Sequence, residues 1–346
     1  MDASSEVRPL TVPHLPSLPN LRVLCSTNYA NCRRPTGLIY RSSRPDLLEP
    51  NDLQKFRELG IKCIIDFRGR KEYANATGTK PLDADFDLYH IKLPTGSGRN
   101  YKPKECVNFV PLEKRTCNKN KSVQLTMRDI RSSKYKQPHF LLDFFAGSYV
   151  WTILNRAPWY KKLYSILFLL YDFVFNTGYK HFVRFFVSNV LNCTGIIGQY
   201  KDMVDLSQRS ICAALKLMCD EANFPILINC AHGKDRTGIV SALILSCNGK
   251  SKQEIAEEYA KSETGVIPMR ERMNKEIVER YHMSEDFLTA RADTMLQLLN
   301  YIEHKYGSVA TYLEIIGFGD TEQEKLKRIL TGEVCIPQCE ADPDTL

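Results

Sequence analysis

The run Ile226-Leu227-Ile228-Asn229-Cys230-Ala231-His232-Gly233-Lys234-Asp235-Arg236-Thr237-Gly238 carries the most specific chemistry of this chain. It opens as an apolar strand, and the residues from about Thr237 to Cys247 are almost wholly apolar, which predicts a buried helix that ends at Gly249. A loop between such a strand and helix can direct its backbone N–H groups and the positive end of the helix at one point. The run therefore predicts an anion-binding loop with a cysteine at the strand end.

Cys230 is the predicted nucleophile of this loop, because a helix N-terminus and a nearby guanidinium favour the thiolate form of cysteine. Arg236 is expected to grip two phosphoryl oxygens, and Thr237 to donate its hydroxyl to the thiolate or to the leaving phosphate. The other predicted substrate-binding residues supply backbone turns, amides or a second cation: Ala231, His232, Gly233, Lys234 and Gly238. The pattern predicts phosphomonoester hydrolysis through a phosphocysteine intermediate, without metal or other cofactor.

Short strand-like runs precede the loop at residues 38–41, 63–67 and 88–93, with a helical pattern over residues 52–60 between the first two. This alternation favours a parallel or mixed sheet flanked by helices, an α/β fold. After the loop, Ser251-Lys252-Gln253-Glu254 has the pattern of a capping box that opens a further helix. The chain is expected to finish as helices packed against one side of the sheet.

A long insertion is predicted from about residue 97 to residue 192, where the strand and helix alternation stops. Its first part, residues 97–137, holds eleven Lys or Arg against three acids, 11 − 3 = +8, whereas the whole chain carries +7. Its second part, from Phe140 to about Leu191, is rich in aromatic residues and contains both tryptophans. The charge favours an anionic partner, either membrane lipid or a polyphosphorylated substrate, and the aromatic part is expected to pack on the domain or to lie at a membrane interface.

The remaining organisation follows from length and composition. Residues 1–19 are rich in Pro and Ser and are expected to form a flexible arm, followed by a single domain over residues 20–332 and a tail over residues 333–346. The N-terminus lacks the pattern of a secretory signal, which predicts a cytoplasmic protein with reduced cysteines. The twelve cysteines show no paired spacing typical of zinc, and no nucleic-acid module is visible.

The loop from Cys230 to Gly238 resembles the signature of the protein tyrosine phosphatase superfamily. Its Gly-Lys-Asp-Arg-Thr-Gly core is similar to that of bacterial tyrosine and dual-specificity phosphatases that also act on phosphoinositides. Outlying segments agree over residues 39–44, 60–68 and 306–317, and the resemblance covers roughly residues 20–95 and 195–332. It implies the cysteine phosphatase fold and substrates that are phosphoproteins, phosphoinositides or both.

Two departures from the family pattern concern the proton chemistry. Asn229 stands where the family usually has His before the nucleophile. The family's usual acid is an Asp on a mobile loop after a strand, but the matching run here, after Leu93, contains no Asp. The resemblance implies Asp235 in the loop as general acid, and Asp66 at its strand end is a second candidate, unless it only pairs with Arg68 or Arg41.

The first hypothesis is thus a cytoplasmic phosphatase with protein and lipid substrates that contacts anionic membranes peripherally and binds no nucleic acid. A catalytically weak phosphate-binding protein or scaffold is the alternative, supported by Asn229 and by the missing aspartate. A sulfurtransferase also uses a loop cysteine, but the Gly-Lys-Asp-Arg-Thr-Gly run disfavours it. The insertion is expected to act either as a lid over the loop or as a membrane anchor.

Overall fold

Short apolar runs form the centre of a seven-stranded sheet in the order β1-β2-β7-β3-β6-β4-β5. The structure is a computed structural model that describes residues 12–25, 37–93, 108–111, 130, 136–145 and 149–332. The strands from β2 to β4 in that order are parallel, whereas β1 and β5 pair antiparallel at the edges. The strand bounds are β1 (Arg22–Cys25), β2 (Ile39–Ser42), β3 (Cys63–Asp66), β4 (Phe86–Lys92), β5 (Asn108–Pro111), β6 (Gln137–Leu141) and β7 (Ile226–Asn229).

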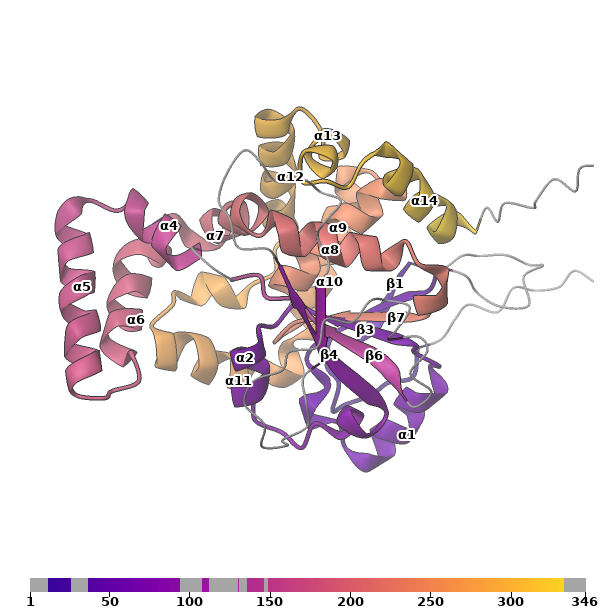
Figure 1. Ribbon diagram of the computed structural model, residues 1–346, viewed down its shortest axis with the longest axis horizontal. Coiled ribbons are helices and arrows are strands. Elements are labelled where there is room, and N and C mark those ends of the chain that lie inside the picture. The colour runs from indigo at the N-terminus through magenta and orange to yellow at the C-terminus, as the bar shows by residue number, and fades with distance from the viewer. Residues whose placement is uncertain are drawn as a thin grey trace, which may run out of the picture.

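Helices cover both faces of the sheet, with α1 on one side and α8, α9 and α12 to α14 on the other (Figure 1). The expected mostly parallel α/β fold is therefore confirmed. The helices in the described ranges are α1 (Pro50–Glu58), α2 (Arg70–Asn75), α4 (Tyr149–Arg156), α5 (Trp159–Val174), α6 (Lys180–Phe186), α7 (Asn192–Leu206), α8 (Gln208–Met218), α9 (Asp235–Cys247), α10 (Lys252–Gly265), α11 (Arg270–Met273), α12 (Ala292–Tyr306), α13 (Val309–Ile315) and α14 (Asp320–Thr331).

Shorter turns complete the connections. The 3-10 turns are η1 (Pro45–Leu47), η2 (Pro81–Ala84), η5 (Glu221–Asn223), η6 (Ile267–Met269) and η8 (Glu285–Leu288), and the π turns are η4 (Val187–Leu191) and η7 (Asn274–Glu279). Ser251 caps α10 in the capping box that the sequence predicted, with its hydroxyl accepting from the backbone N–H of Glu254.

The core follows the two-residue period of the strands. Ile65 and Ile228 point to the larger cluster under α8 and α9, whereas Ile64 and Leu227 point to the smaller cluster under α1. Helix α9 is the central element, because every residue from Arg236 to Leu245 is buried. Burying each large apolar side chain stabilises the fold by about 1.5–3 kcal/mol relative to leaving it exposed. The loop before α9 is therefore mounted on a rigid strand and a rigid helix.

Two sequence expectations are corrected. The strand pattern does not stop throughout the predicted insertion at residues 97–192, because β5 and β6 lie within it and β6 pairs between β3 and β4. Among the described residues of the predicted insertion, the helical part from α4 onward stands outside the sheet. The flexible arm predicted for residues 1–19 is wrong for its second half, because Leu15 and Leu18 are buried in the smaller core cluster. Residues 1–11 lie outside the described residues.

Candidate active site

The Cys230 loop lies at the carboxyl edge of the sheet, where three neighbouring parallel strands end. β7 runs between β2 and β3, so the loop from Cys230 to Lys234 is flanked by the segments that follow those two strands. The backbone N–H of Phe67 donates to the carbonyl of Asn229 (2.8 Å), and that of Arg44 donates to Ala231 (3.3 Å). Cys230 is only 1% exposed, at the point where β7 gives way to α9. The expected strand–loop–helix unit is present.

Two glycines let the loop bend and pack closely. Gly233 has a φ of +67°, and a Cβ there would come within 2.1 Å of the carbonyl oxygen of Ser42. Gly238 lies in the first turns of α9, where a Cβ would sit 2.9 Å from the ring of Tyr259. The structure therefore assigns both glycines a steric role in shaping the loop.

The guanidinium of Arg236 is oriented by a carboxylate that the sequence pattern did not predict. Its two terminal nitrogens donate to the two oxygens of Glu72 on α2, each at 2.7 Å, and Nη1 also donates to the carbonyl of Phe67 (2.8 Å). Its guanidinium carbon stands 5.1 Å from the centre of the Phe145 ring. Burial alone would lower the pKa of Arg236, but Glu72 outweighs burial and raises it. Arg236 is thus a fixed cation.

Two polar side chains of the loop have no hydrogen-bond partner among the described residues. The Thr237 hydroxyl is buried and unpartnered, and so are both amide atoms of Asn229. An orphaned buried polar group is costly, and a bound ligand that pairs with it is one physical reason for its presence. Thr237 follows Arg236 directly at the start of α9, and its hydroxyl is available to donate, which is compatible with the predicted contact to the thiolate or to a phosphoryl oxygen.

Lys234, the predicted second cation of the loop, is occupied by contacts within the protein. Its ammonium is fully buried and donates to the carbonyls of Phe287 (2.9 Å) and Thr289 (2.8 Å), and it pairs with Asp235 (2.9 Å). An ammonium has three N–H donors, and these three contacts use them all. Lys234 therefore anchors the loop to the segment around η8.

Asp235, the first candidate acid, is held as a carboxylate. Its Oδ1 accepts from the hydroxyl of Tyr200 (2.6 Å) and pairs with Lys234. Burial would raise the pKa of Asp235, but Lys234 and the Tyr200 hydroxyl outweigh burial and lower the pKa below its usual range. A general acid must carry a proton at the working pH, and this environment opposes that.

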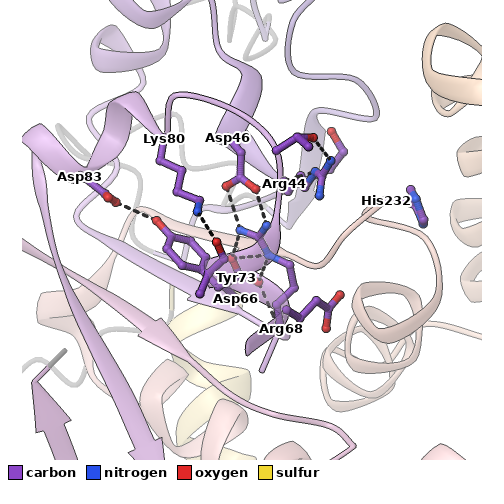
Figure 2. A network of polar contacts seen from close by, with 12 residues as sticks. Arg44, Asp46, Asp66, Arg68, Tyr73, Lys80, Asp83 and His232 are labelled. Carbon is purple, nitrogen blue, oxygen red and sulfur yellow. Dashed lines mark hydrogen bonds and ion pairs between the residues drawn. The ribbon is translucent and has the colours of Figure 1, made fainter. Parts of the chain in front are cut away.

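Asp66, the second candidate acid, belongs to a buried ion-pair network (Figure 2). Arg68 lies between two carboxylates, with hydrogen bonds of 2.6–3.0 Å to Asp66 and of 2.5 and 3.1 Å to Asp46. Burial would raise the pKa of Asp66, but Arg68 lowers it strongly. These contacts favour the structural alternative for Asp66, and its partner is Arg68 rather than Arg41. Arg41 instead pairs with Glu258 at 2.6 Å.

A third carboxylate, Asp143, was missed because β6 was not recognised. It follows β6, the strand next to β3, and a Cβ on Gly69 would stand 2.6 Å from its Oδ2. Its Oδ1 accepts from the backbone N–H of Phe145 (2.9 Å), the residue whose ring lies against Arg236. No described residue donates to Oδ2. Asp143 is half-buried beside the segment that holds Arg236, on a loop after a strand.

His232 faces the outer rim of the loop. Its Nε2 lies 2.9 Å from Oε2 of Glu276 in η7. Burial lowers the pKa of His232, partly offset by Glu276, so the ring is neutral at pH 7. Around the loop, the described residues contain no group of three or more His, Cys, Asp or Glu side chains that could hold a metal ion.

Comparisons with known proteins agree with this geometry. The sequence profile described as the tyrosine phosphatase family matches residues 13–169 and 190–332. The chain is 28% identical over 140 residues to the triple specificity protein phosphatase PtpB of Mycobacterium tuberculosis. The matched region covers 36% of this chain and 50% of that protein. It is 37% identical over 65 residues to the inositol diphosphatase DSP1 of Oryza sativa subsp. japonica, covering 19% of this chain and 29% of that protein.

The chain thus spans half or less of the length of these two relatives. The family match, by contrast, covers most of this chain, from the buried part of the N-terminal segment through the Cys230 loop to the end of α14. The loop that carries Cys230 and Arg236, on a strand–loop–helix unit in a mostly parallel sheet, lies within the matched residues. This chain belongs to the tyrosine phosphatase family.

Proposed function

We propose that the protein is a cysteine-dependent phosphomonoester hydrolase. The single observation that carries this proposal is the pre-set position of Arg236, which Glu72 fixes beside a loop that begins with the nearly buried Cys230. A phosphoryl dianion repels a thiolate, so the site must supply fixed positive charge before the reaction begins. Arg236, the N-terminus of α9 and the Thr237 hydroxyl supply donors on that side of the loop.

The reaction runs in two displacements. The Cys230 thiolate attacks phosphorus, the bond from phosphorus to the leaving oxygen breaks, and that oxygen takes a proton from a carboxyl group. Water then attacks the phosphocysteine, the sulfur–phosphorus bond breaks, and the same carboxylate takes a proton from the water. The products are the dephosphorylated alcohol and inorganic phosphate, and the thiolate is restored.

Two carboxyl groups compete for the role of proton donor. Asp235 is within the loop but accepts from Tyr200 and pairs with Lys234, which keeps it ionised. Asp143 is half-buried, has one oxygen without a donor among the described residues, and lies on a loop beside Arg236. These contacts favour Asp143. The leaving-group dependence of hydrolysis in Asp143→Asn and Asp235→Asn separates the two.

The proposed substrates are phosphoproteins and phosphoinositides, with the lipid turned over faster. The name of one relative, a triple specificity protein phosphatase, supports the phosphoproteins, and that of the other, an inositol diphosphatase, supports substrates with an inositol ring. The lipid preference rests on the hairpin of α5 and α6, defined here as residues 159–186, which stands away from the sheet at one end of the molecule (Figure 1).

The outward surface of the hairpin is apolar, although α5 buries few of its side chains. The only buried residues of α5 are Ser165 and Asp172, both polar. Asp172 accepts from the backbone N–H of Phe182 (2.7 Å) and contacts His181 (2.7 Å), so it holds the hairpin closed. The exposed side chains are large and apolar, at 44% to 76% exposure within α5: Trp159, Tyr160, Leu163, Tyr164, Ile166, Leu167, Leu170, Tyr171, Phe173 and Val174. This arrangement is the inverse of a helix that packs on a core.

A membrane surface is the proposed partner of this face. Trp and Tyr favour the boundary between water and lipid, and exposed apolar patches of this kind mark interaction sites. Cations flank the apolar side chains at Lys161, Lys162, Lys180 and Arg184, and residues 97–137 add a net +8, which suits an anionic leaflet. Among the residues that the structure describes, no helix is long and apolar enough to cross a membrane. The contact is therefore proposed as peripheral, with the protein in the cytoplasm.

A substrate panel tests the proposal. Purified protein is assayed for phosphate release from phosphoinositides in anionic vesicles and from phosphotyrosine peptides, with Cys230→Ser as the control. We expect release from both, faster from the lipid, and none from the variant. No release from any substrate by the unaltered protein would favour the alternative, a catalytically weak phosphate-binding scaffold, whereas equal or slower lipid turnover would remove only the lipid preference.

A further inference from the structure

A cluster of two arginines and a histidine lies at the rim of the Cys230 loop, next to the site described above. Three residues from separate elements surround the carboxylate of Glu276: Arg44 after β2, His232 in the loop, and Arg272 in α11. Arg44 Nη2 donates to Glu276 Oε1 (3.1 Å), His232 Nε2 lies 2.9 Å from Oε2, and Arg272 Nε is 3.9 Å from Oε1. A single carboxylate thus faces three donors.

The two arginines are not satisfied by this arrangement. Arg44 is only 7% exposed, yet its Nε has no hydrogen-bond partner among the described residues, and neither has the buried Nε of Arg272. The remaining contacts of Arg44 are long, at 3.3 Å to the Thr77 hydroxyl and 3.7 Å to Asp46. Burial and the neighbouring Arg44 both lower the pKa of Arg272. Gathering like charges and leaving buried donors unpaired costs stability, and a further anion bound between the two arginines would offset that cost.

The contrast with the other arginines near the loop is direct. Arg236 meets Glu72 with two hydrogen bonds of 2.7 Å, and Arg68 uses all its nitrogens on Asp46 and Asp66. In those pairs each guanidinium meets its carboxylates through several short hydrogen bonds, as is typical of structural ion pairs. Glu276 instead keeps a side chain that is 30% exposed, and it makes a single good hydrogen bond to each of two partners. It is the member of the cluster that water or a ligand can reach and replace.

We propose that Arg44, Arg272 and His232 form a second phosphate subsite. In the free protein the carboxylate of Glu276 occupies the position of that phosphate. Its ligand is a second phosphate group on the inositol ring whose first phosphate lies in the Cys230 loop, and the inference therefore rests on the proposed function. Figure 2 shows Arg44 beside Asp46, on the side toward His232. His232 is two positions after Cys230, and the backbone of Arg44 bonds to Ala231, so the cluster borders the loop directly and one small molecule can offer a phosphate to each.

A ring fits this requirement better than a peptide. Two phosphates on neighbouring ring carbons point in similar directions from a rigid frame, whereas successive side chains of an extended peptide point to opposite faces. A phosphate offers three acceptor oxygens, enough for both unpaired Nε groups and for His232, while a carboxylate offers two. The subsite is therefore expected to select ring substrates with two phosphates over those with one.

The test compares soluble short-chain phosphoinositides that carry one or two ring phosphates. The measured quantity is the ratio of kcat/KM for the doubly to the singly phosphorylated head group. Removing one charge-assisted contact should lower this ratio about tenfold in Arg272→Ala. Glu276→Gln should raise it, because the resident anion then competes less. Arg270→Ala is the matched control, since Arg270 is exposed on the same helix and pairs only at 3.9 Å with Glu263 among the described residues.

The ratio separates this proposal from loss of the fold, because a damaged fold lowers both kcat/KM values together. Arg44→Gln provides a second variant from another element. A ratio that stays the same in Arg272→Ala and Arg44→Gln overturns the subsite, and so does an equal change measured with doubly and singly phosphorylated peptides.

Binding of soluble inositol phosphates by calorimetry distinguishes the subsite from the proposed function. If no substrate releases phosphate, the function fails, and the subsite then stands or falls on binding alone. A tighter Kd for the doubly phosphorylated ring that weakens about tenfold in Arg272→Ala supports it. Equal Kd values for the two rings overturn it.

Discussion

Glu72 and Arg236 face each other through two parallel hydrogen bonds of 2.7 Å, although they are far apart in the sequence. Glu72 belongs to the helix after β3, and Arg236 to the helix after β7, so the pair joins the ends of two neighbouring parallel strands. This contact fixes the direction of the guanidinium before any substrate arrives. A clamp fixed in advance loses less conformational entropy when it binds a phosphoryl group.

Replacing Glu72 by Gln should therefore reduce catalysis more than stability. Gln accepts one of the two hydrogen bonds but lacks the charge, so the guanidinium of Arg236 gains conformational freedom. Because the guanidinium is then less well oriented toward the phosphoryl group, kcat/KM should fall roughly 10- to 100-fold. Steady-state hydrolysis of an aryl phosphate gives the value. Lys71→Gln, a change at an exposed position on the same helix, is the matched control and should leave kcat/KM as it is. A Glu72→Gln enzyme with unaltered kcat/KM would show that Arg236 needs no positioning.

The proton donor is identified by its dependence on the leaving group. If Asp143 donates the proton, Asp143→Asn should slow hydrolysis of alkyl phosphates by about 10²–10⁴-fold, because their oxygens need a proton to depart. The same variant should have much less effect on aryl phosphates with acidic leaving groups. Asp235→Asn is measured in parallel with the same substrates. A leaving-group dependence that appears only in Asp235→Asn would return the role to the loop aspartate.

Acid should weaken the fold through the network of Asp66, Arg68 and Asp46. The pKa of Asp66 is lower in the folded protein than in the unfolded chain, so its stabilising contribution is complete above the unfolded value of about 4 and is lost as the pH falls below it. The free energy of unfolding in urea, measured from about pH 7 to about pH 3, should decrease toward acid.

Asp66→Asn provides the comparison for that experiment. It leaves Arg68 with one charged partner and should cost about 3–5 kcal/mol at pH 7, as breaking a buried pair does. It should also remove part of the pH dependence, since the titrating group is gone. A variant whose unfolding free energy follows the same pH curve as the unaltered protein would assign the acid sensitivity to other carboxylates.

The hairpin of α5 and α6 should control vesicle binding. Leu170 and Phe173 are 55% and 74% exposed, so a double change to Glu should leave folding intact while it removes apolar contact and adds charge against an anionic surface. Binding to phosphatidylserine vesicles in a sedimentation assay should weaken at least about tenfold. Ile315→Glu, at a position 56% exposed on α13, is the matched control.

Two other results would contradict the membrane contact. Unaltered vesicle binding in the Leu170 and Phe173 double variant would exclude the hairpin as the contact surface. Light scattering gives the second result: if the unaltered protein forms a stable dimer and the double variant is monomeric, the apolar face binds a second copy of this chain instead.

The strand–loop–helix unit could be predicted because its information is local. An apolar strand, a glycine-rich turn with Arg236 six positions after Cys230, and an apolar helix are contiguous in the sequence. The strand β6 could not be predicted in the same way. It contains Pro138 and the buried His139 in only five residues, and a two-residue period is not visible over so short a run.

Side-chain partners were harder to predict than elements. The charge of Lys234 predicts a substrate-binding cation. The direction of its side chain, however, depends on the segment around η8, which lies more than fifty residues later. Glu72 and Asp143 were missed because their importance comes only from the packing of neighbouring strand ends. The pairing of Asp66 with Arg68 was among the alternatives, since the two are only two positions apart. Contacts between distant segments are set by topology, which the sequence pattern describes only coarsely.

The most direct test of the account is detection of the phosphocysteine. The protein is mixed with an aryl phosphate, quenched in acid within the first turnovers, digested and analysed by mass spectrometry. The account predicts a phosphoryl group on the peptide that contains Cys230, and neither that adduct nor phosphate release in Cys230→Ser. Phosphate release by Cys230→Ser at a rate near that of the unaltered protein would contradict it.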